Sequence, residues 1–125
     1  MYAKGKNALG RRGEDMACAY LESIGHEILE RNWKSGRLEI DIITSFRDGV
    51  HFVEVKSAAS PGSFDPAEKV DERKRRRITS AALRYLNAHA GGARGEVSFD
   101  VVSVVFEGGE SRISYVPGAW IPIYL

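Results

Sequence analysis

The sequence predicts a single α/β domain in which helices cover both faces of a mixed sheet. Two segments, residues 11–24 and 66–89, carry apolar residues at helical spacing. Five shorter segments have the composition of strands, and most of them end at turns that contain glycine. The resulting order of helix, three strands, helix and two strands is typical of a layered sandwich. The length of 125 residues is that of one ordinary domain.

Both helices have recognisable ends. The first, residues 11–24, stops at Gly25, which suits a C-cap, and the second, residues 66–89, stops before Gly91 and Gly92. Their apolar faces consist of Ala17, Tyr20, Leu21 and Ile24 in the first helix and of Val70, Ile78, Ala81, Ala82, Tyr85 and Leu86 in the second. Each helix therefore has one face that can pack on a sheet.

The strands are expected between and after these helices. They cover residues 26–33, 38–44, 50–57, 97–106 and 112–116. The second and third are joined by the turn sequence Arg47-Asp48-Gly49, which favours an antiparallel hairpin. The apolar tail, residues 119–125, is expected to pack on the body of the domain or against a partner.

Positive charge is concentrated in two places. The formal net charge of +1 does not by itself argue for nucleic-acid binding. However, residues 1–12 contain four cations and no carboxylate, and residues 73–77 are five cations in a row. We expect residues 1–12 to form a flexible basic arm ahead of a domain that spans residues 13–125. Local basic patches can exist on a nearly neutral protein.

Several classes of protein are disfavoured by composition. The single cysteine, Cys18, excludes an internal disulfide framework and a zinc site built from several cysteines. No apolar run approaches the roughly 20 residues that a membrane span needs. We therefore expect a cytoplasmic protein without membrane contact. His26, His51 and His89 show no metal-ligand spacing, and the role of Asp100, which interrupts an apolar strand, stays open between structure and site.

The chemistry is concentrated in the hairpin. Side chains alternate between the two faces of a strand, so Glu39 and Asp41 should share one face of the first hairpin strand. Glu54 and Lys56 should share one face of the next. Ile43 and Phe52 are expected on this charged face, and Leu38, Ile40, Ile42, Val53 and Val55 on the opposite face. A face that mixes charged and apolar residues should be partly buried.

Three carboxylates in a partly buried patch repel one another, and a divalent cation would relieve that repulsion. Mg²⁺ or Mn²⁺ prefers oxygen ligands and often shares them with water and substrate phosphate. A lysine beside the metal, here Lys56, can orient or deprotonate the attacking water or offset charge on phosphate. This combination favours phosphodiester hydrolysis. The alternative is an exposed hairpin face with cross-strand charge pairs.

A set of short blocks also follows the order found in one protein family. These blocks are Gly13-Glu14, Tyr20-Leu21, Arg31-Asn32-Trp33, Glu39-Ile40-Asp41, Phe52-Val53-Glu54-Val55-Lys56, Lys74, Arg77-Ile78, Tyr85-Leu86 and Phe99-Asp100-Val101-Val102. On these blocks the chain resembles the YraN-type family of small bacterial proteins, from about Gly13 to Trp120. One departure is Leu38, which stands where the family usually has Gly.

The resemblance implies a restriction-endonuclease-like three-layer fold, related to archaeal Holliday-junction resolvases within the PD-(D/E)xK group. It also implies a metal centre of Glu14, Asp41, Glu54 and Lys56, and by analogy a homodimer. Glu39 is a further candidate ligand from the hairpin pattern, acting directly or through water. From its position alone, Glu14 is better explained as an acid near a helix N-terminus.

The resulting expectation is a Mg²⁺- or Mn²⁺-dependent nuclease that acts on DNA. Its catalytic residues would be Asp41, Glu54 and Lys56. The residues expected to contact nucleic acid are Lys74, Arg75, Arg76 and Arg77 together with Arg11 and Arg12. The alternatives are a solvated helix face for the arginines and a snorkelling side chain for Lys74. For the protein, they are a non-catalytic nucleic-acid-binding module and a protein-interaction module that keep the fold.

Overall fold

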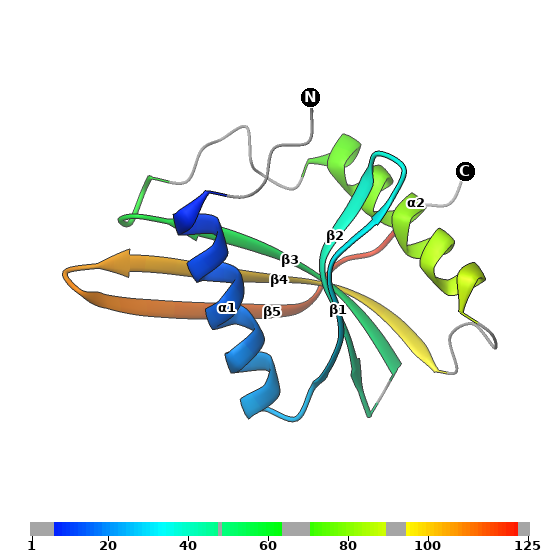
Figure 1. Cartoon of the computed structure of the whole chain (residues 1–125), viewed down its shortest axis with the longest axis horizontal. Coiled ribbons are helices and arrows are strands. Elements are labelled where there is room, and N and C mark those ends of the chain that lie inside the picture. The colour runs from blue at the N-terminus through cyan, green and yellow to red at the C-terminus, as the bar shows by residue number, and fades with distance from the viewer. Residues whose placement is uncertain (1–6, 48, 64–70, 90–94, 123–125) are drawn as a thin grey trace.

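The computed structural model describes residues 7–47, 49–63, 71–89 and 95–122. These residues form two helices and five strands (Figure 1). In chain order the elements are α1 (Ala8–Ser23), β1 (Glu27–Ser35), β2 (Leu38–Phe46), β3 (Gly49–Ala58), α2 (Glu72–Ala88), β4 (Glu96–Glu107) and β5 (Glu110–Trp120). The predicted α/β class and the predicted order of elements are confirmed.

The five strands form one mixed sheet in the order β1-β2-β3-β4-β5. The pairs β1–β2, β2–β3 and β4–β5 are antiparallel, and β3–β4 is parallel. A parallel pair needs a crossover connection, and α2 provides it between β3 and β4. The expected hairpin of β2 and β3 is therefore present at the centre of the sheet.

The two helices cover opposite faces of this sheet and give the three-layer arrangement that was expected (Figure 1). The α1 core consists of Ala17, Cys18, Leu21, Ile42, Val53, Val102, Val104 and Phe106. The α2 core consists of Ile40, Ile43, Phe52, Ile78, Ala81, Ala82, Tyr85, Phe99 and Trp120. Neither helix is long and apolar enough to cross a bilayer, as far as the described residues go.

The expected alternation fails at one point in β2. Ile40 and Ile42 were predicted to share a face, but Ile40 packs in the α2 core and Ile42 in the α1 core. The prediction is wrong at a level where the neighbouring strand β1 also departs from regular strand conformation. Asn32 of β1 has a φ of 52°. It lies between Arg31, which pairs with Ile42, and Trp33, which pairs with Ile40. A left-handed residue in a strand turns the backbone, and Asn tolerates this conformation better than most residues.

The N-terminal helix starts earlier than predicted. α1 begins at Ala8 rather than at residue 11, and the side chain of Asn7 caps it by accepting a hydrogen bond from Gly10 N at 2.8 Å. Residues 8–12 are thus helical and not part of an arm. Residues 1–6 of the expected arm lie outside the described residues.

The second helix starts later than predicted. Asp71 has extended backbone, and its side chain accepts a hydrogen bond from Lys74 N at 2.9 Å, so α2 begins at Glu72 rather than at residue 66. This cap was missed because Pro66 is also a suitable first helical residue. Residues 66–70 lie outside the described residues.

The C-terminal strand is longer than expected and takes up part of the apolar tail. β5 continues to Trp120, which is buried, whereas Ile121 is 86% exposed. Trp120 pairs with Phe99 and packs in the α2 core. Residues 123–125 lie outside the described residues.

Gly13 allows α1 to approach β3 closely. A Cβ at this position would lie 1.8 Å from Ser57 Oγ and 2.9 Å from Ser57 Cβ. We expect Gly13→Ala to lower the free energy of unfolding by roughly 1–3 kcal/mol through overpacking, although alanine is the better helix former by about 1 kcal/mol. Urea denaturation measures the change. Adding Ser57→Gly should restore most of the loss, and a Gly13→Ala variant as stable as the wild type would contradict this account of the helix contact.

Candidate metal centre

The centre of the site is a fork between β2 and β3. Their antiparallel ladder ends at the pair Ile42 and Val53. Beyond it, β3 continues beside β4 to the pair Ala58 and Val105, while β2 stays with β1. Asp41 is the first β2 residue past the end of this ladder. The two strands therefore separate at the residue that carries the carboxylate.

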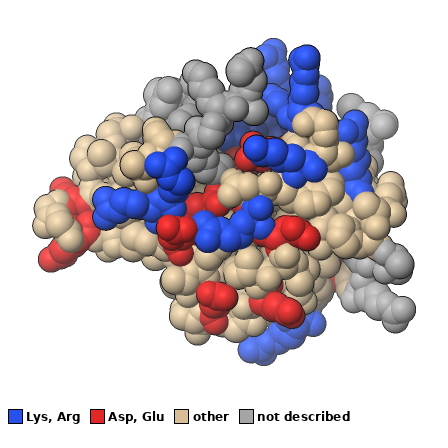
Figure 2. Space-filling model, in the orientation of Figure 1, with Lys and Arg blue, Asp and Glu red and all other residues tan. Residues whose placement is uncertain are grey.

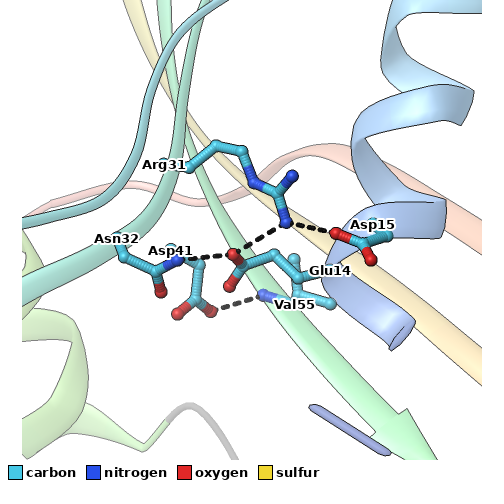
Figure 3. A network of polar contacts seen from close by, with 6 residues as sticks. All are labelled: Glu14, Asp15, Arg31, Asn32, Asp41 and Val55. Atoms are coloured by element: carbon cyan, nitrogen blue, oxygen red, sulfur yellow. Dashed lines mark hydrogen bonds and ion pairs between the residues drawn. The ribbon is translucent and has the colours of Figure 1, made fainter. Parts of the chain in front are cut away.

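Asp41 is fixed by the backbone of the opposite strand. Its Oδ2 atom accepts a hydrogen bond from Val55 N at 2.9 Å (Figure 3). The side chain thus supplies an acceptor to β3 where the ladder with β2 has ended. Asp41 is only 8% exposed. Its orientation is consequently set by the fold and does not depend on a ligand.

Glu54 lies next to Asp41 and is 7% exposed. Burial and the neighbouring charge of Asp41 raise the pKa of Glu54 to about 8, although Lys74 acts in the opposite direction. Lys74 Nζ forms an ion pair with Glu54 Oε2 at 2.6 Å. When both carboxylates are ionised, their two negative charges exceed the single positive charge of Lys74, and a further cation would neutralise the remainder.

Glu14 reaches the same region from α1 and is 2% exposed. Its Oε1 atom accepts hydrogen bonds from Asn32 Nδ2 at 2.7 Å and from Arg31 Nη2 at 3.2 Å. The same Arg31 nitrogen also contacts Asp15 at 2.6 Å. Figure 3 shows Glu14 and Asp41 pointing toward a common space from α1 and β2. Sequence reasoning missed Arg31 and Asn32 as partners of Glu14, although both belong to one of the family-like blocks.

A cleft of about 900 Å³ opens over this region. All the predicted catalytic and metal-ligand residues line it, namely Glu14, Glu39, Asp41, Glu54 and Lys56. Basic residues from the β1–β2 turn and from α2 also line it, and these are Arg37, Arg73, Lys74 and Arg77. Figure 2 shows Lys and Arg side chains gathered over the part of the molecule where α2 lies. The cleft thus combines a carboxylate centre with cations.

The predicted nucleic-acid contacts divide into two groups. Lys74 and Arg77 line the cleft, and Arg77 also donates to Arg37 O at 3.5 Å. The other predicted residues lie elsewhere: Arg12 over the Phe106 ring, Arg75 over the Trp120 ring, Arg76 beside Glu72, and Arg11 exposed on α1.

One arginine of the cleft, Arg37, was not predicted from the sequence, because it is in a turn without periodicity. Arg73 belongs to the basic run that was considered for contact with a nucleic-acid backbone, and it lines the cleft. Leu38, which stands where the family usually has Gly, packs against the α2 core and is not among the residues that line the cleft.

The donor set fits a cation of the Mg²⁺ class. Among the described residues, no group of three or more His, Cys, Asp or Glu side chains is arranged to hold a metal ion alone. The expected set of four carboxylates is therefore not a closed cage. Mg²⁺ is commonly held by one or two carboxylates together with water and substrate phosphate, and Asp41 with Glu54 matches that pattern. Glu14 and Glu39 line the same cleft and can act through water.

Comparisons with known proteins agree with the resemblance found in the sequence. Residues 13–104 match the family described as "Uncharacterised protein family UPF0102". The chain belongs to the UPF0102 family. This is the YraN-type family, so the expected membership is confirmed.

UPF0102 proteins from distant bacteria align with nearly the whole chain. The chain is 40% identical to a UPF0102 protein of Anaeromyxobacter dehalogenans (strain 2CP-C), over 93% of this chain and 86% of that protein. It is 36% identical to one from Bacteroides thetaiotaomicron, over 93% and 94% of the two chains. A third, from Rhodococcus jostii (strain RHA1), is 40% identical over 90% of this chain and 96% of its own. Each alignment is long enough to span the fork and the cleft.

The raised pKa of Glu54 makes a prediction for stability without metal. The folded state holds this proton up to about pH 8, whereas the unfolded chain loses it near the ordinary value of 4.5. Stability from this group is therefore full below pH 4.5 and is lost as pH rises through 8. The amide in Glu54→Gln cannot ionise. The unfolding free energy of Glu54→Gln minus that of the wild type should thus be larger at pH 9 than at pH 5, by more than about 1 kcal/mol.

Urea denaturation in EDTA at the two pH values measures this difference. An advantage of Glu54→Gln that is the same at both pH values would show that burial does not perturb Glu54.

Proposed function

We propose that this protein is a metal-dependent nuclease of the PD-(D/E)xK type, with a restriction-endonuclease-like fold, that hydrolyses phosphodiester bonds in DNA. The observation that carries the proposal is the fork between β2 and β3, where Asp41 and Glu54 are buried side by side. Their shared negative charge supports Mg²⁺ or Mn²⁺ as the cofactor.

The chain's own residues would then divide the work. Asp41, held by Val55 N, and Glu54 would bind the cation. A bound divalent ion would polarise the phosphate and acidify a water molecule. Lys56 follows Glu54 on β3, lines the cleft, and would orient that water or take its proton.

The substrate would be held by the cations of the cleft. Arg37, Arg73 and Arg77 line the cleft and would contact backbone phosphates, which supply affinity without base readout. Glu14, fixed by Asn32 and Arg31, would act on the metal through water. The other predicted contacts lie outside the cleft and would touch only the outer parts of a long DNA molecule. These residues are Arg11, Arg12, Arg75 and Arg76.

A cleavage assay tests the function. Purified protein is incubated with Mg²⁺ or Mn²⁺ and with single-stranded, duplex and four-way DNA. We expect cleavage of at least one substrate, its loss in EDTA, and its loss in Lys56→Ala but not in Lys34→Ala, a matched change of an exposed lysine on β1. Cleavage that is unchanged in Lys56→Ala would contradict the assignment. Salt-dependent DNA binding without cleavage would favour the non-catalytic alternative.

A further inference from the structure

The ion pair between α2 and β3 involves the same oxygen atoms that a metal would use. Lys74 lies in the first turn of α2, where its backbone N–H donates to the capping Asp71. Lys74 lines the cleft, and its Nζ lies 2.6 Å from Glu54 Oε2. The Lys74 side chain is 40% exposed whereas that of Glu54 is 9% exposed. Lys74 thus brings the charge of a partly exposed side chain to the buried carboxylate of Glu54.

Simple electrostatics makes this contact compete with a metal on the same carboxylate. An ammonium group and a divalent cation within a few ångströms of each other repel strongly where water is excluded. Asp41 is held separately by Val55 N, so Glu54 is the carboxylate whose partner would have to change. Lysine has a flexible four-carbon stem and can move its charge without moving its backbone.

We propose that Lys74 is an exchangeable resident cation of this centre: its ammonium group pairs with Glu54 while no divalent ion is bound, and it leaves Glu54 when one binds. The inference rests on the proposed function, because it takes Asp41 and Glu54 as the metal ligands. Lys74 then sets the metal concentration at which the site fills. Once released, it would join Arg73 and Arg77, which line the same cleft, as a cation available to substrate phosphate.

Amine labelling of the full chain tests the exchange directly. The protein is acylated at trace level with and without Mg²⁺, and the modified lysines are identified by peptide mass. We expect Lys74 to be protected without Mg²⁺ and several-fold more reactive with it, and the exposed Lys34 on β1 to be unaffected. The Mg²⁺ effect should vanish in Asp41→Ala. A Lys74 reactivity that is unchanged at a saturating Mg²⁺ concentration would overturn the proposal.

Calorimetric titration with Mn²⁺ gives a second readout that does not depend on activity. Lys74→Met should bind Mn²⁺ about tenfold more tightly than the wild type, because the competing charge is gone. Arg77→Met is the matched control: it removes a cation of the same helix and cleft, but one that bonds Arg37 O. We expect it to change the affinity by less than about threefold.

The outcomes separate this inference from the proposed function. If Mn²⁺ binds in an Asp41-dependent way but Lys74→Met binds no more tightly than Arg77→Met, the exchange is refuted and the metal site stands. If neither the wild type nor Lys74→Met binds Mn²⁺, both proposals fail. If Lys74→Met alone binds, Lys74 is confirmed as the competing cation.

Discussion

Replacement of Asp41 by alanine is expected to lower metal-dependent DNA cleavage by more than about 100-fold. Loss of a residue that only supports a metal ligand costs up to about 100-fold, and Asp41 would bind the metal itself. The reason is its position: Asp41 sits where β2 and β3 part, and its orientation is fixed by Val55 N rather than by solvent. Loss of its carboxylate leaves Glu54 as a single buried acid.

The variant Asp41→Asn makes the same test sharper. An asparagine retains an oxygen that can accept the hydrogen bond from Val55 N, so local structure should be preserved while the charge is lost. Initial cleavage rates and circular dichroism of both variants are the measurements. Asp41→Asn should be as inactive as Asp41→Ala and should remain folded. An active Asp41→Asn would mean that the carboxylate charge is not required.

Asp100→Ala is expected to have the largest effect on stability, a loss of about 3–5 kcal/mol. Asp100 is 1% exposed, and its oxygens accept hydrogen bonds from three strands. The donors are His51 on β3, Ser98 on β4, and Tyr115 and Gly118 on β5, at 2.6, 2.6, 2.6 and 3.0 Å. Burial raises the pKa of Asp100, but these hydrogen bonds together hold it below its ordinary value. Alanine would leave several buried donors without this acceptor.

Chemical denaturation at pH 7 measures the effect, with Tyr115→Phe as the control. Tyr115→Phe removes one of the four hydrogen bonds and should cost roughly 1–2 kcal/mol. Neither Asp100 nor Tyr115 is among the cleft residues, so the activity of Tyr115→Phe should be retained. If Asp100→Ala were no less stable than Tyr115→Phe, the four contacts would not act as one network.

Local sequence patterns were sufficient for the elements and for much of the site. Strand composition and the Asp48-Gly49 turn predicted the β2–β3 hairpin, and alternation predicted that Asp41 and Glu54 come together. These features depend on neighbours that are close in sequence. Alternation failed between Ile40 and Ile42, at the level where Asn32 of the adjacent strand has a left-handed backbone. A single strand's pattern does not contain its partner's conformation.

Contacts between distant segments were beyond sequence reasoning. His51 and Asp100 are 49 residues apart and meet because β3 and β4 pair in parallel. His51 was noted only for its lack of metal-ligand spacing, and the role of Asp100 was left open. In the same way, Lys74 was expected to contact nucleic acid or to be a snorkelling side chain, and packing of α2 on the sheet brings its Nζ to Glu54. Side-chain type indicated chemistry, whereas the tertiary fold decided the partners.

The most direct test of the central claim is to locate a bound divalent ion at the fork. Mn²⁺ is added in small amounts to ¹⁵N-labelled protein, and paramagnetic broadening of amide signals is followed by NMR. We predict that the signal of Val55 and those of its neighbours at Asp41 and Glu54 disappear first, while the β4–β5 turn near Gly108 is unaffected. In Asp41→Asn this early broadening should be lost. Broadening that starts elsewhere, or that persists at Val55 in Asp41→Asn, would contradict a metal centre built on Asp41 and Glu54.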